Sequence, residues 1–441
     1  MSAAAARSWR IAAGGSLGGT LTVPGDKSIS HRALMLGALA RGETRIEGFL
    51  SGADCLATLA ALRALGVSIE QPAADSVRVQ GAGPAALRAP PAPLDMGNAG
   101  TAMRLMMGLL APQRLQATLI GDASLMRRPM ERVALPLRLM GADVRTQDGR
   151  PPVEIHPVAA LRGIDYALPV ASAQLKSALL LAALGAAGET RLTEPAATRD
   201  HTERMLAAFG VRLGRGPDSV TLAGGQPLHG TEIGVPADFS SAAFFLVAGA
   251  LAAPQALTLT NIGVNPTRTG LLELLRLMGA DIRVSPHAPA AGAGGEPLAD
   301  LEVRRSALRG IEVPPALVPL AIDELPVFFI AAACARGESV VRGAAELRVK
   351  ESDRLAGMAA GLAALGVEHR LLPDGLWIRG REQLEGGVID SLGDHRIAMA
   401  FAVAALRARA PVEIRDVANV DTSFPGFVET ARRAGLAIEL S

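Results

Sequence analysis

An apolar-periodic run that ends in glycine and leads into a strand-like segment recurs six times along the chain. A glycine directly after such a run is typical of the left-handed residue that ends many helices. Successive glycines are roughly 70 residues apart, except for one longer interval, and such a period indicates internal repeats. The six glycines are Gly66, Gly141, Gly210, Gly279, Gly366 and Gly435.

Each repeat shows the same order of elements. An Ala/Leu-rich helix follows a polar start, and a strand, a second helix, the glycine and closing strands come after it. This order suits a βαβαββ unit, so we predict a mixed α/β (α+β) fold of two similar lobes, each with three units. The first lobe is expected at 23–236, and the second at 1–22 and 237–441. The longer interval contains 286–297, rich in Pro, Gly and Ala, which predicts an inserted hairpin loop.

The composition narrows the class of protein. With 441 residues and a formal net charge of +1, the chain shows no general footprint for nucleic acid or for a membrane surface. Its apolar runs are shorter than the roughly 18–20 residues that a membrane span needs. Cys55 and Cys334 cannot form a disulfide framework, which favours a reducing compartment. Neither a zinc-ligand spacing nor an HExxH motif is present. We therefore expect a cytoplasmic protein without a metal site.

Polar residues that suit anion binding stand at the starts of the repeated helices. The chain has three lysines, Lys27, Lys176 and Lys350, against 41 arginines, and each lysine lies near such a start. A lysine differs from an arginine because its ammonium is compact and can lose its proton when desolvated. Free N–H groups and the dipole make a helix start suitable for phosphate or carboxylate. For Asp238, Ser240 and Asp394 we favour the simpler role of a helix cap.

Arginines occupy equivalent places at four of the six second-helix starts. The helix dipole disfavours a cation at this end, so four such placements indicate an anion held between helices. The segment 348–354 adds ammonium, carboxylate and guanidinium groups within about one turn, and Asp323 offers a further titratable group for proton transfer. The four arginines are Arg128, Arg199, Arg268 and Arg354.

Six motifs in order resemble the 5-enolpyruvylshikimate-3-phosphate synthase family over nearly the whole chain. The segments 25–28 (GDKS) and 98–104 (NAGTAMR) come first, followed by 128–130 (RPM) and 172–174 (SAQ). The last two are 350–354 (KESDR) and 394–399 (DHRIAM). The resemblance implies two lobes of three βαβαββ units, an enolpyruvyl transferase-like inside-out α/β barrel that closes over a cleft. Segments such as 199–203 (RDHTE) are similar to the class II branch of the family.

The resemblance also implies a reaction. Members transfer the enolpyruvyl group of phosphoenolpyruvate to the 5-hydroxyl of shikimate 3-phosphate by addition–elimination and release phosphate, on the pathway to chorismate and aromatic amino acids. No cofactor or metal is implied, and we expect a monomer whose partners are these two small molecules, with no nucleic acid and no membrane.

The family's site residues carry over to matching positions. By resemblance, shikimate 3-phosphate is bound by Lys27, Ser28, Arg32, Ser172, Ala173, Gln174, Arg199, Asp323 and Lys350. Phosphoenolpyruvate is bound by Lys27, Gly100, Arg128, Gln174, Arg354 and Arg396. Asp323 is expected to accept the hydroxyl proton, and Lys27 and Glu351 are candidates to protonate the methylene carbon.

Some features depart from the family pattern or leave other functions open. Many members outside the class II branch have a lysine before the C-terminal Thr-Phe-Pro, and 421–425 (DTSFP) has none. Gly100 favours sensitivity to glyphosate whereas the class II motifs favour tolerance, so neither is predicted. One alternative is a UDP-N-acetylglucosamine enolpyruvyl transferase, which typically has Lys-Asn at 27–28 and a reactive loop cysteine. Another is a non-catalytic repeat scaffold, for which scattered surface charges are expected.

Overall fold

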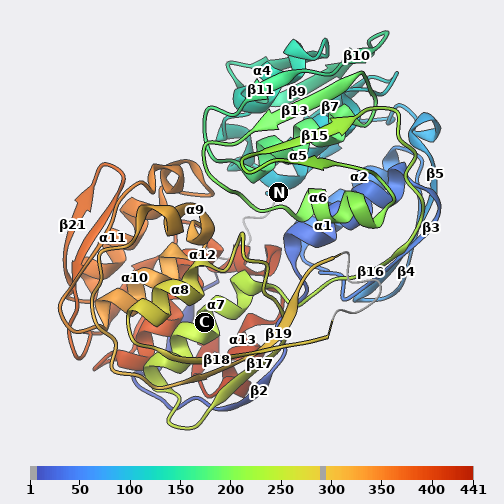
Figure 1. The fold of residues 1–441 in the computed structure, drawn as a ribbon. Coiled ribbons are helices and arrows are strands. Elements are labelled where there is room, and N and C mark those ends of the chain that lie inside the picture. Colours follow the sequence, from blue (N-terminus) through green and yellow to red (C-terminus); the bar gives the residue numbers. More distant parts are fainter. Residues whose placement is uncertain (1–6, 289–294, 441) are drawn as a thin grey trace. The chain divides into compact units, whose positions relative to one another are not determined.

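The computed structural model describes residues 7–288 and 295–440. The chain divides into two compact units (Figure 1). Unit 2 comprises Gly25–Pro236 together with Gly295 and Glu296, and unit 1 comprises the chain up to Pro24, Ala237–Ala288 and the chain from Pro297. The predicted lobe boundaries differ from these bounds at residues 23–24 and near the end of the inserted loop.

Unit 2 contains the first three repeats. Its helices are α1 (Lys27–Leu39), α2 (Ala53–Ala64), α3 (Gly100–Leu110), α4 (Glu131–Leu139), α5 (Ala173–Ala183) and α6 (His201–Ala208). Its strands are β3 (Arg41–Glu47), β4 (Ser68–Ala73), β5 (Ser76–Ala82), β6 (Leu94–Asp95), β7 (Ala117–Ile120), β8 (Asp143–Gln147), β9 (Arg150–His156), β10 (Leu161–Arg162), β11 (Asp165–Ala167), β12 (Ala186–Ala187), β13 (Glu189–Thr193), β14 (Gly214–Arg215), β15 (Ser219–Ala223) and β16 (Glu232–Gly234).

Unit 1 contains the last three repeats and the first two strands of the chain. Its helices are α7 (Phe239–Ala252), α8 (Gly270–Leu277), α9 (Val318–Ala321), α10 (Leu325–Ala333), α11 (Arg354–Ala364), α12 (His395–Ala404) and α13 (Phe427–Ala434). Its strands are β1 (Trp9–Ile11), β2 (Gly19–Leu21), β17 (Leu257–Gly263), β18 (Asp281–Pro286), β19 (Leu298–Arg304), β20 (Glu338–Val341), β21 (Glu368–Leu372), β22 (Gly375–Arg379), β23 (Gly387–Asp390), β24 (Val412–Arg415) and β25 (Ile438–Leu440).

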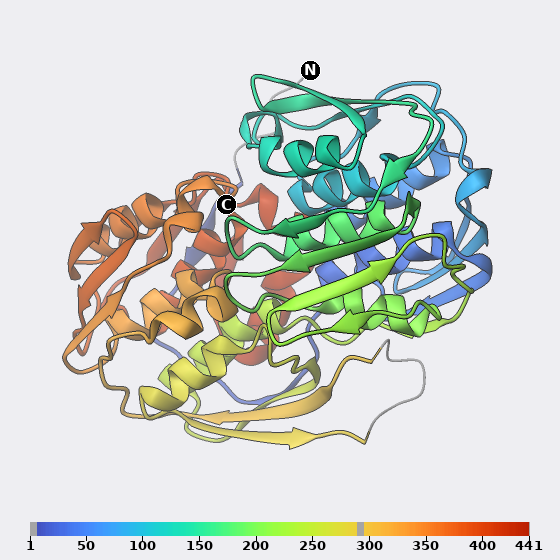
Figure 2. The same ribbon diagram turned by 45° about the horizontal axis from the view of Figure 1, so that its top comes forward.

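The sheets follow the repeats. In the second repeat the elements run β6, α3, β7, α4, β8, β9, and the sheet order is β6-β7-β9-β8, with β6 parallel to β7 and the other pairs antiparallel. The third repeat has the equivalent sheet β11-β13-β15-β14. Figure 2 shows the strands of this repeat, in green, in front of helices of the same unit. The predicted βαβαββ order and mixed α/β class are therefore confirmed.

Three repeats take a strand from elsewhere in their own unit. In unit 2, β16 lies parallel to β3 and supplies the first strand of the first repeat. In unit 1, β2 lies parallel to β17 of the fourth repeat, and β1 lies between β24 and β25 of the sixth. Each unit is thus completed by chain that is remote in sequence.

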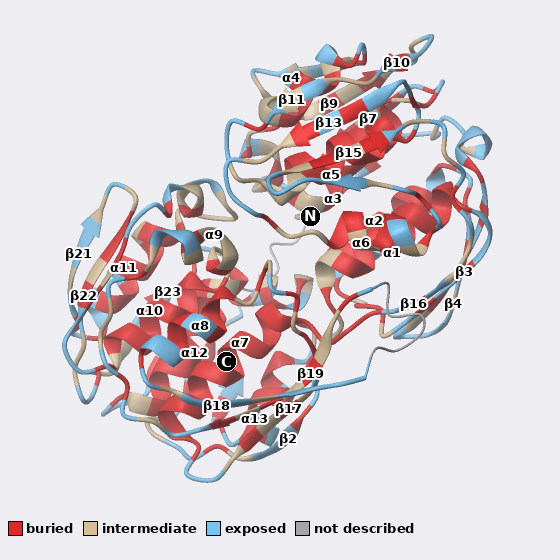
Figure 3. Ribbon diagram, in the orientation of Figure 1, coloured by how far each residue is buried: buried red, intermediate tan, exposed pale blue. Residues whose placement is uncertain are grey.

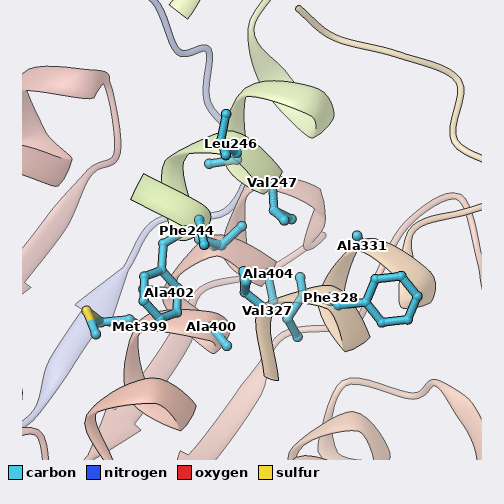
Figure 4. Packing of buried hydrophobic residues seen from close by; sticks show 14 of the residues in the cluster. Phe244, Leu246, Val247, Val327, Phe328, Ala331, Met399, Ala400, Ala402 and Ala404 are labelled. Carbon is cyan, nitrogen blue, oxygen red and sulfur yellow. The ribbon is translucent and has the colours of Figure 1, made fainter. Parts of the chain in front are cut away.

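The first helices of the repeats are the centres of the two cores. In unit 1 every residue of α7 and of α10 is buried (Figure 3). Figure 4 shows side chains of α7, α10 and α12 packed together, among them Phe244, Phe328 and Met399. In unit 2, ten of the eleven residues of α3 are buried. Helices that are apolar on all sides need such positions, because no face of them suits water.

Glycines end the second helices as predicted. All six glycines have positive φ, from 70° at Gly366 to 114° at Gly435, which a residue with a side chain adopts at a cost. A different need applies at Gly108, where a Cβ atom would lie 2.0 Å from the carbonyl oxygen of Ala178, so glycine lets α3 approach α5.

The insertion in the fourth repeat joins β18 to β19, which pair antiparallel, so the predicted hairpin is confirmed. Its residues 289–294 lie outside the described part of the chain. Among the described helices, none on its own is long and apolar enough to cross a membrane; a pair bent by 119°, Pro315–Ala321 with Leu325–Ala333, meets that test by length and composition.

Candidate active site

Lys27 is the first residue of α1 and contacts the start of α2. Asp26 caps α1 by accepting a hydrogen bond from the N–H of Ile29 at 2.9 Å. The Lys27 Nζ lies 3.0 Å from Asp54 Oδ2, and both side chains are largely buried. Glycine is required at position 25, because a Cβ there would lie 1.8 Å from the carbonyl oxygen of Gly48. The ammonium is therefore held between two helix starts. Asp54 was not anticipated from the sequence.

Arg32 lies one turn after Ser28, and its buried guanidinium donates hydrogen bonds to neutral partners. Its Nε donates to Thr202 Oγ1 at 2.7 Å, its Nη2 to Ser177 Oγ at 2.7 Å and its Nη1 to the carbonyl oxygen of Ser28 at 2.9 Å. Among the described residues, each hydrogen bond of this guanidinium ends on a neutral oxygen. Burial lowers the pKa of Arg32 to about 10. A buried cation whose hydrogen bonds all end on neutral oxygens keeps donors that suit an anion.

The start of α5 is linked to α3 by hydrogen bonds of the Gln174 side-chain amide. Ser172 caps α5 by accepting from the N–H of Leu175 at 3.3 Å, and Ala173 is the first helical residue. Gln174 donates to Thr101 Oγ1 at 2.8 Å and accepts from Arg104 Nη1 at 2.7 Å. These bonds hold the predicted Gln174 in one orientation. Arg104 was part of a recognised motif, but its role as a contact of Gln174 was missed.

Gly100 and Arg128 lie against each other. The Arg128 Nη2 donates to Asn98 Oδ1 at 2.6 Å and to Ser124 Oγ at 3.3 Å, and the side chain is buried. A Cβ at position 100 would lie 2.8 Å from Arg128 Nη1. Glycine thus leaves space that the guanidinium occupies. Arg199 lies in the loop before α6 and is close enough to contribute, by its charge, to lowering the pKa of Arg32.

The predicted residues of unit 1 form a charged cluster around Arg354. Lys350 Nζ is 3.3 Å and Arg354 Nη1 3.5 Å from Asp323 Oδ1, while Arg354 Nη2 is 2.6 Å from Glu351 Oε2. Arg354 Nε donates to Asp394 Oδ2 at 2.8 Å. Burial acts to lower the pKa of Arg354, but Asp394, Glu351 and Asp323 outweigh burial and raise it. The structure therefore brings together Asp323, Lys350, Glu351 and Arg354 as the sequence predicted.

Arg396 belongs to the same cluster. Its Nη1 donates to the carbonyl oxygen of Asp323 at 2.7 Å and lies 3.6 Å from Glu324 Oε1. Glu324 is fully buried and accepts a short hydrogen bond from Ser240 Oγ, which in turn accepts from Arg268 Nη2 at 2.7 Å. The place of Glu324 beside Arg396 follows from the fold alone.

Two expectations about the helix starts need correction. Asp238 and Asp394 are N-caps as favoured, accepting from the N–H groups of Ser240 and Arg396. Ser240 is not a cap, because it lies inside α7 and its hydroxyl bridges Arg268 and Glu324. The same two aspartates also pair with Arg268 and Arg354. For these two arginines the dipole argument for an external anion fails, since a capping carboxylate of the chain already compensates the charge.

Known proteins match the chain along its length. The model of the family described as EPSP synthase (3-phosphoshikimate 1-carboxyvinyltransferase) matches residues 11–431. The chain belongs to this family.

Individual relatives and solved structures of the same family also match the chain over nearly its full length. A 3-phosphoshikimate 1-carboxyvinyltransferase of Alkalilimnicola ehrlichii is 59% identical over 431 residues, covering 98% of this chain and 96% of the relative. One of Halorhodospira halophila is 60% identical over 433 residues, covering 98% and 97%. A structure of EPSP synthase from Acinetobacter baumannii superimposes with a TM-score of 0.87 at 51% identity, covering 99% and 100%. The predicted family and its fold are thereby confirmed.

No cluster of three or more His, Cys, Asp or Glu side chains able to hold a metal ion occurs in 7–288 or 295–440. The site chemistry within each unit is that of cations, carboxylates and helix starts.

Proposed function

We infer that this protein has the activity of its family. It transfers the enolpyruvyl group of phosphoenolpyruvate to the 5-hydroxyl of shikimate 3-phosphate and releases phosphate, a step towards chorismate and aromatic amino acids. The observation that carries this conclusion is the full-length identity of nearly 60% to relatives named 3-phosphoshikimate 1-carboxyvinyltransferase. The arrangement of charges supports it, because two anionic substrates require cations at helix starts.

Residues of unit 2 supply most of the proposed contacts to the substrates. Shikimate 3-phosphate is bound in unit 2 by Lys27, Ser28, Arg32, Ser172, Ala173, Gln174 and Arg199, and in unit 1 by Asp323 and Lys350. Phosphoenolpyruvate is bound by Lys27, Gly100, Arg128, Gln174, Arg354 and Arg396. The neutral hydrogen-bond partners of Arg32 support this assignment, since no carboxylate of the chain binds the guanidinium directly among the described residues.

The proposed reaction is an addition followed by an elimination. In the addition, the 5-oxygen of shikimate 3-phosphate bonds to C2 of phosphoenolpyruvate while its proton passes to Asp323, and a proton is added to the methylene carbon from Lys27 or Glu351. In the elimination, the C2–O bond to phosphate breaks and the new methyl group returns a proton to the chain. General acid–base groups of this kind contribute rate factors of about 10²–10⁴ each.

Arg354 couples binding to proton transfer in this proposal. Its guanidinium already contacts Asp323, Glu351 and Asp394. An anionic substrate that binds Arg354 therefore competes with these carboxylates for its N–H groups. Competition weakens the hold on Asp323 and Glu351, the two carboxylates that are assigned proton transfers.

Phosphate release tests the proposed activity directly. Purified protein is given phosphoenolpyruvate with shikimate 3-phosphate or, in a parallel reaction, with UDP-N-acetylglucosamine. We expect phosphate with the first acceptor and none with the second. The reverse pattern would identify the alternative transferase, and no release with either acceptor would support the scaffold.

The finer expectations on partners and location are also proposals. We propose that the protein acts as a cytoplasmic monomer without a cofactor. Neither Cys55 nor Cys334 forms a disulfide. Cys55 is buried, and burial raises the pKa of Cys334 to about 12, which disfavours the reactive thiolate. Light scattering on the eluting protein tests the monomer, and a mass near twice 45.4 kDa would contradict it.

A further inference from the structure

Lys176 is the one lysine of three that the proposed reaction does not use. It lies on α5, and its side chain is almost completely buried. Its Nζ is 2.7 Å from Glu194 Oε2, 2.7 Å from Glu203 Oε1 and 3.4 Å from the carbonyl oxygen of Thr198. Burial acts to lower the pKa of Lys176, but Glu203 and Glu194 outweigh burial and raise it, so the ammonium is retained. Burying three charges is costly and gives weak stability. The cluster therefore invites a functional explanation.

The explanation lies in the residue next to each member of this pair, Ser177 on α5 and Thr202 on α6. Lys176 and Ser177 are neighbours on α5, and Thr202 and Glu203 are neighbours on α6. Lys176 pairs with Glu203, while Ser177 and Thr202 pair with each other at 2.7 Å and both accept from Arg32. Because a guanidinium only donates, both hydroxyl oxygens must accept from it, and the Thr202 hydrogen then points to Ser177. The hydroxyl pair therefore fixes the plane of the Arg32 guanidinium.

Glu203 is the carboxylate best placed to compete with the two hydroxyl groups for the Arg32 guanidinium. Among the charged neighbours of Arg32, it has the largest effect on the pKa of the guanidinium. Its Oε2 is buried and has no hydrogen-bond partner among the described residues. A buried carboxylate without Lys176 would draw compensation from Arg32, whose pKa it already raises, at the expense of the two hydroxyl contacts.

We propose that Lys176 is a positioning residue that holds Glu203 away from Arg32, so that the charge of Arg32 stays available to the anionic acceptor substrate. The same ammonium binds the carbonyl oxygen of Thr198, the residue before Arg199, and so also fixes the loop that carries this second cation. The assignment rests on the proposed function, in which Arg32 and Arg199 bind shikimate 3-phosphate.

Three variants separate this role from a merely structural one. Lys176→Met leaves Glu203 uncompensated, and we expect the KM for shikimate 3-phosphate to rise at least about tenfold, the equivalent of 1.4 kcal/mol, with a smaller change in kcat. Glu203→Gln removes the competing charge while Lys176 keeps Glu194, so its KM should stay within about threefold of wild type, under 0.7 kcal/mol. The double variant should recover the affinity that Lys176→Met loses.

A purely structural role for the contact between Lys176 and Glu203 predicts a different pattern of KM values. If the contact of Lys176 with Glu203 merely joins α5 to α6, both single variants raise KM alike and the double variant is no better than either. That result would overturn the proposal, as would a KM within about threefold of wild type, under 0.7 kcal/mol, for Lys176→Met. Should Lys176→Met not fold, Glu203→Gln and the double variant still decide, since the proposal requires both to bind shikimate 3-phosphate as wild type does in calorimetry. Inactive wild-type protein would instead contradict the proposed function.

Discussion

Arg32 in unit 2 and Arg354 in unit 1 are both buried guanidinium groups near the start of a helix, yet their surroundings differ. Arg32 donates to two hydroxyl groups and a carbonyl oxygen, and burial lowers its pKa to about 10. Arg354 contacts three carboxylates, which outweigh burial and raise its pKa. One repeat architecture thus supplies a cation that is hydrogen-bonded to neutral oxygens in one unit, where we propose binding, and a cation paired with carboxylates in the other, where we propose proton transfer.

The strongest test of the unit 1 role is Asp323→Asn. The amide keeps the shape of the side chain but cannot accept the hydroxyl proton, so kcat should fall by about 10²–10⁴. Steady-state kinetics measures the fall, and calorimetry measures whether shikimate 3-phosphate still binds. A kcat within about threefold of wild type would remove Asp323 from the proton-transfer step.

Replacing Arg354 or Arg32 by methionine tests whether their different surroundings matter for stability. Arg354→Met leaves buried Asp394 and its neighbours without their cation, and we expect a loss of about 3–5 kcal/mol in the free energy of unfolding. Arg32→Met leaves hydroxyl groups that can bond to each other, so its loss should be about 1–3 kcal/mol. Denaturant unfolding of both variants gives the two values. Equal losses would show that the surroundings of the two cations do not differ in energy.

A smaller change tests the binding role of unit 2. In Gly100→Ala the new Cβ would lie 2.8 Å from Arg128 Nη1, and the guanidinium must move. We expect the KM for phosphoenolpyruvate to rise about tenfold, the equivalent of 1.4 kcal/mol, while the KM for shikimate 3-phosphate stays near wild type. Gly18→Ala, where a Cβ meets no atom within 4 Å and φ is not positive, is the control for an added methyl group that makes no contact. An unchanged KM for phosphoenolpyruvate would contradict the contact.

The smallest expected effect concerns the loss of stability of unit 2 at acid pH. His31 is buried, its Nδ1 lies 2.8 Å from Thr58 Oγ1, and burial together with Lys27 and Arg32 lowers its pKa from 6.5 to about 3. The neutral imidazole therefore adds stability that is complete above pH 6.5 and is lost as the pH falls towards 3. His31→Gln should flatten the pH dependence of unfolding in this window, by up to about 1.4 kcal/mol per pH unit. Parallel curves for variant and wild type would exclude His31 as the cause.

The sequence by itself determined the repeat and the identity of the motifs. The six cap glycines were predictable because a helix C-terminus is a local structure that depends on a few adjacent residues. The caps at Asp238 and Asp394 were predictable for the same reason. The family motif at 350–354 and the resemblance as a whole predicted Lys350, Glu351, Arg354 and Asp323 as neighbours, and the fold of unit 1 places them together.

The tertiary structure alone decided which charge compensates which. Asp54 beside Lys27, Glu324 beside Arg396 and Glu203 beside Lys176 come from other helix starts, remote in sequence. Electrostatic interactions act through space and grow as burial excludes water, so residue type and spacing along the chain cannot assign the partners. For that reason the dipole argument treated four arginines alike, while folding gave Arg268 and Arg354 carboxylates of their own. Packing of the helices, rather than any local pattern, therefore set the charge left for substrates.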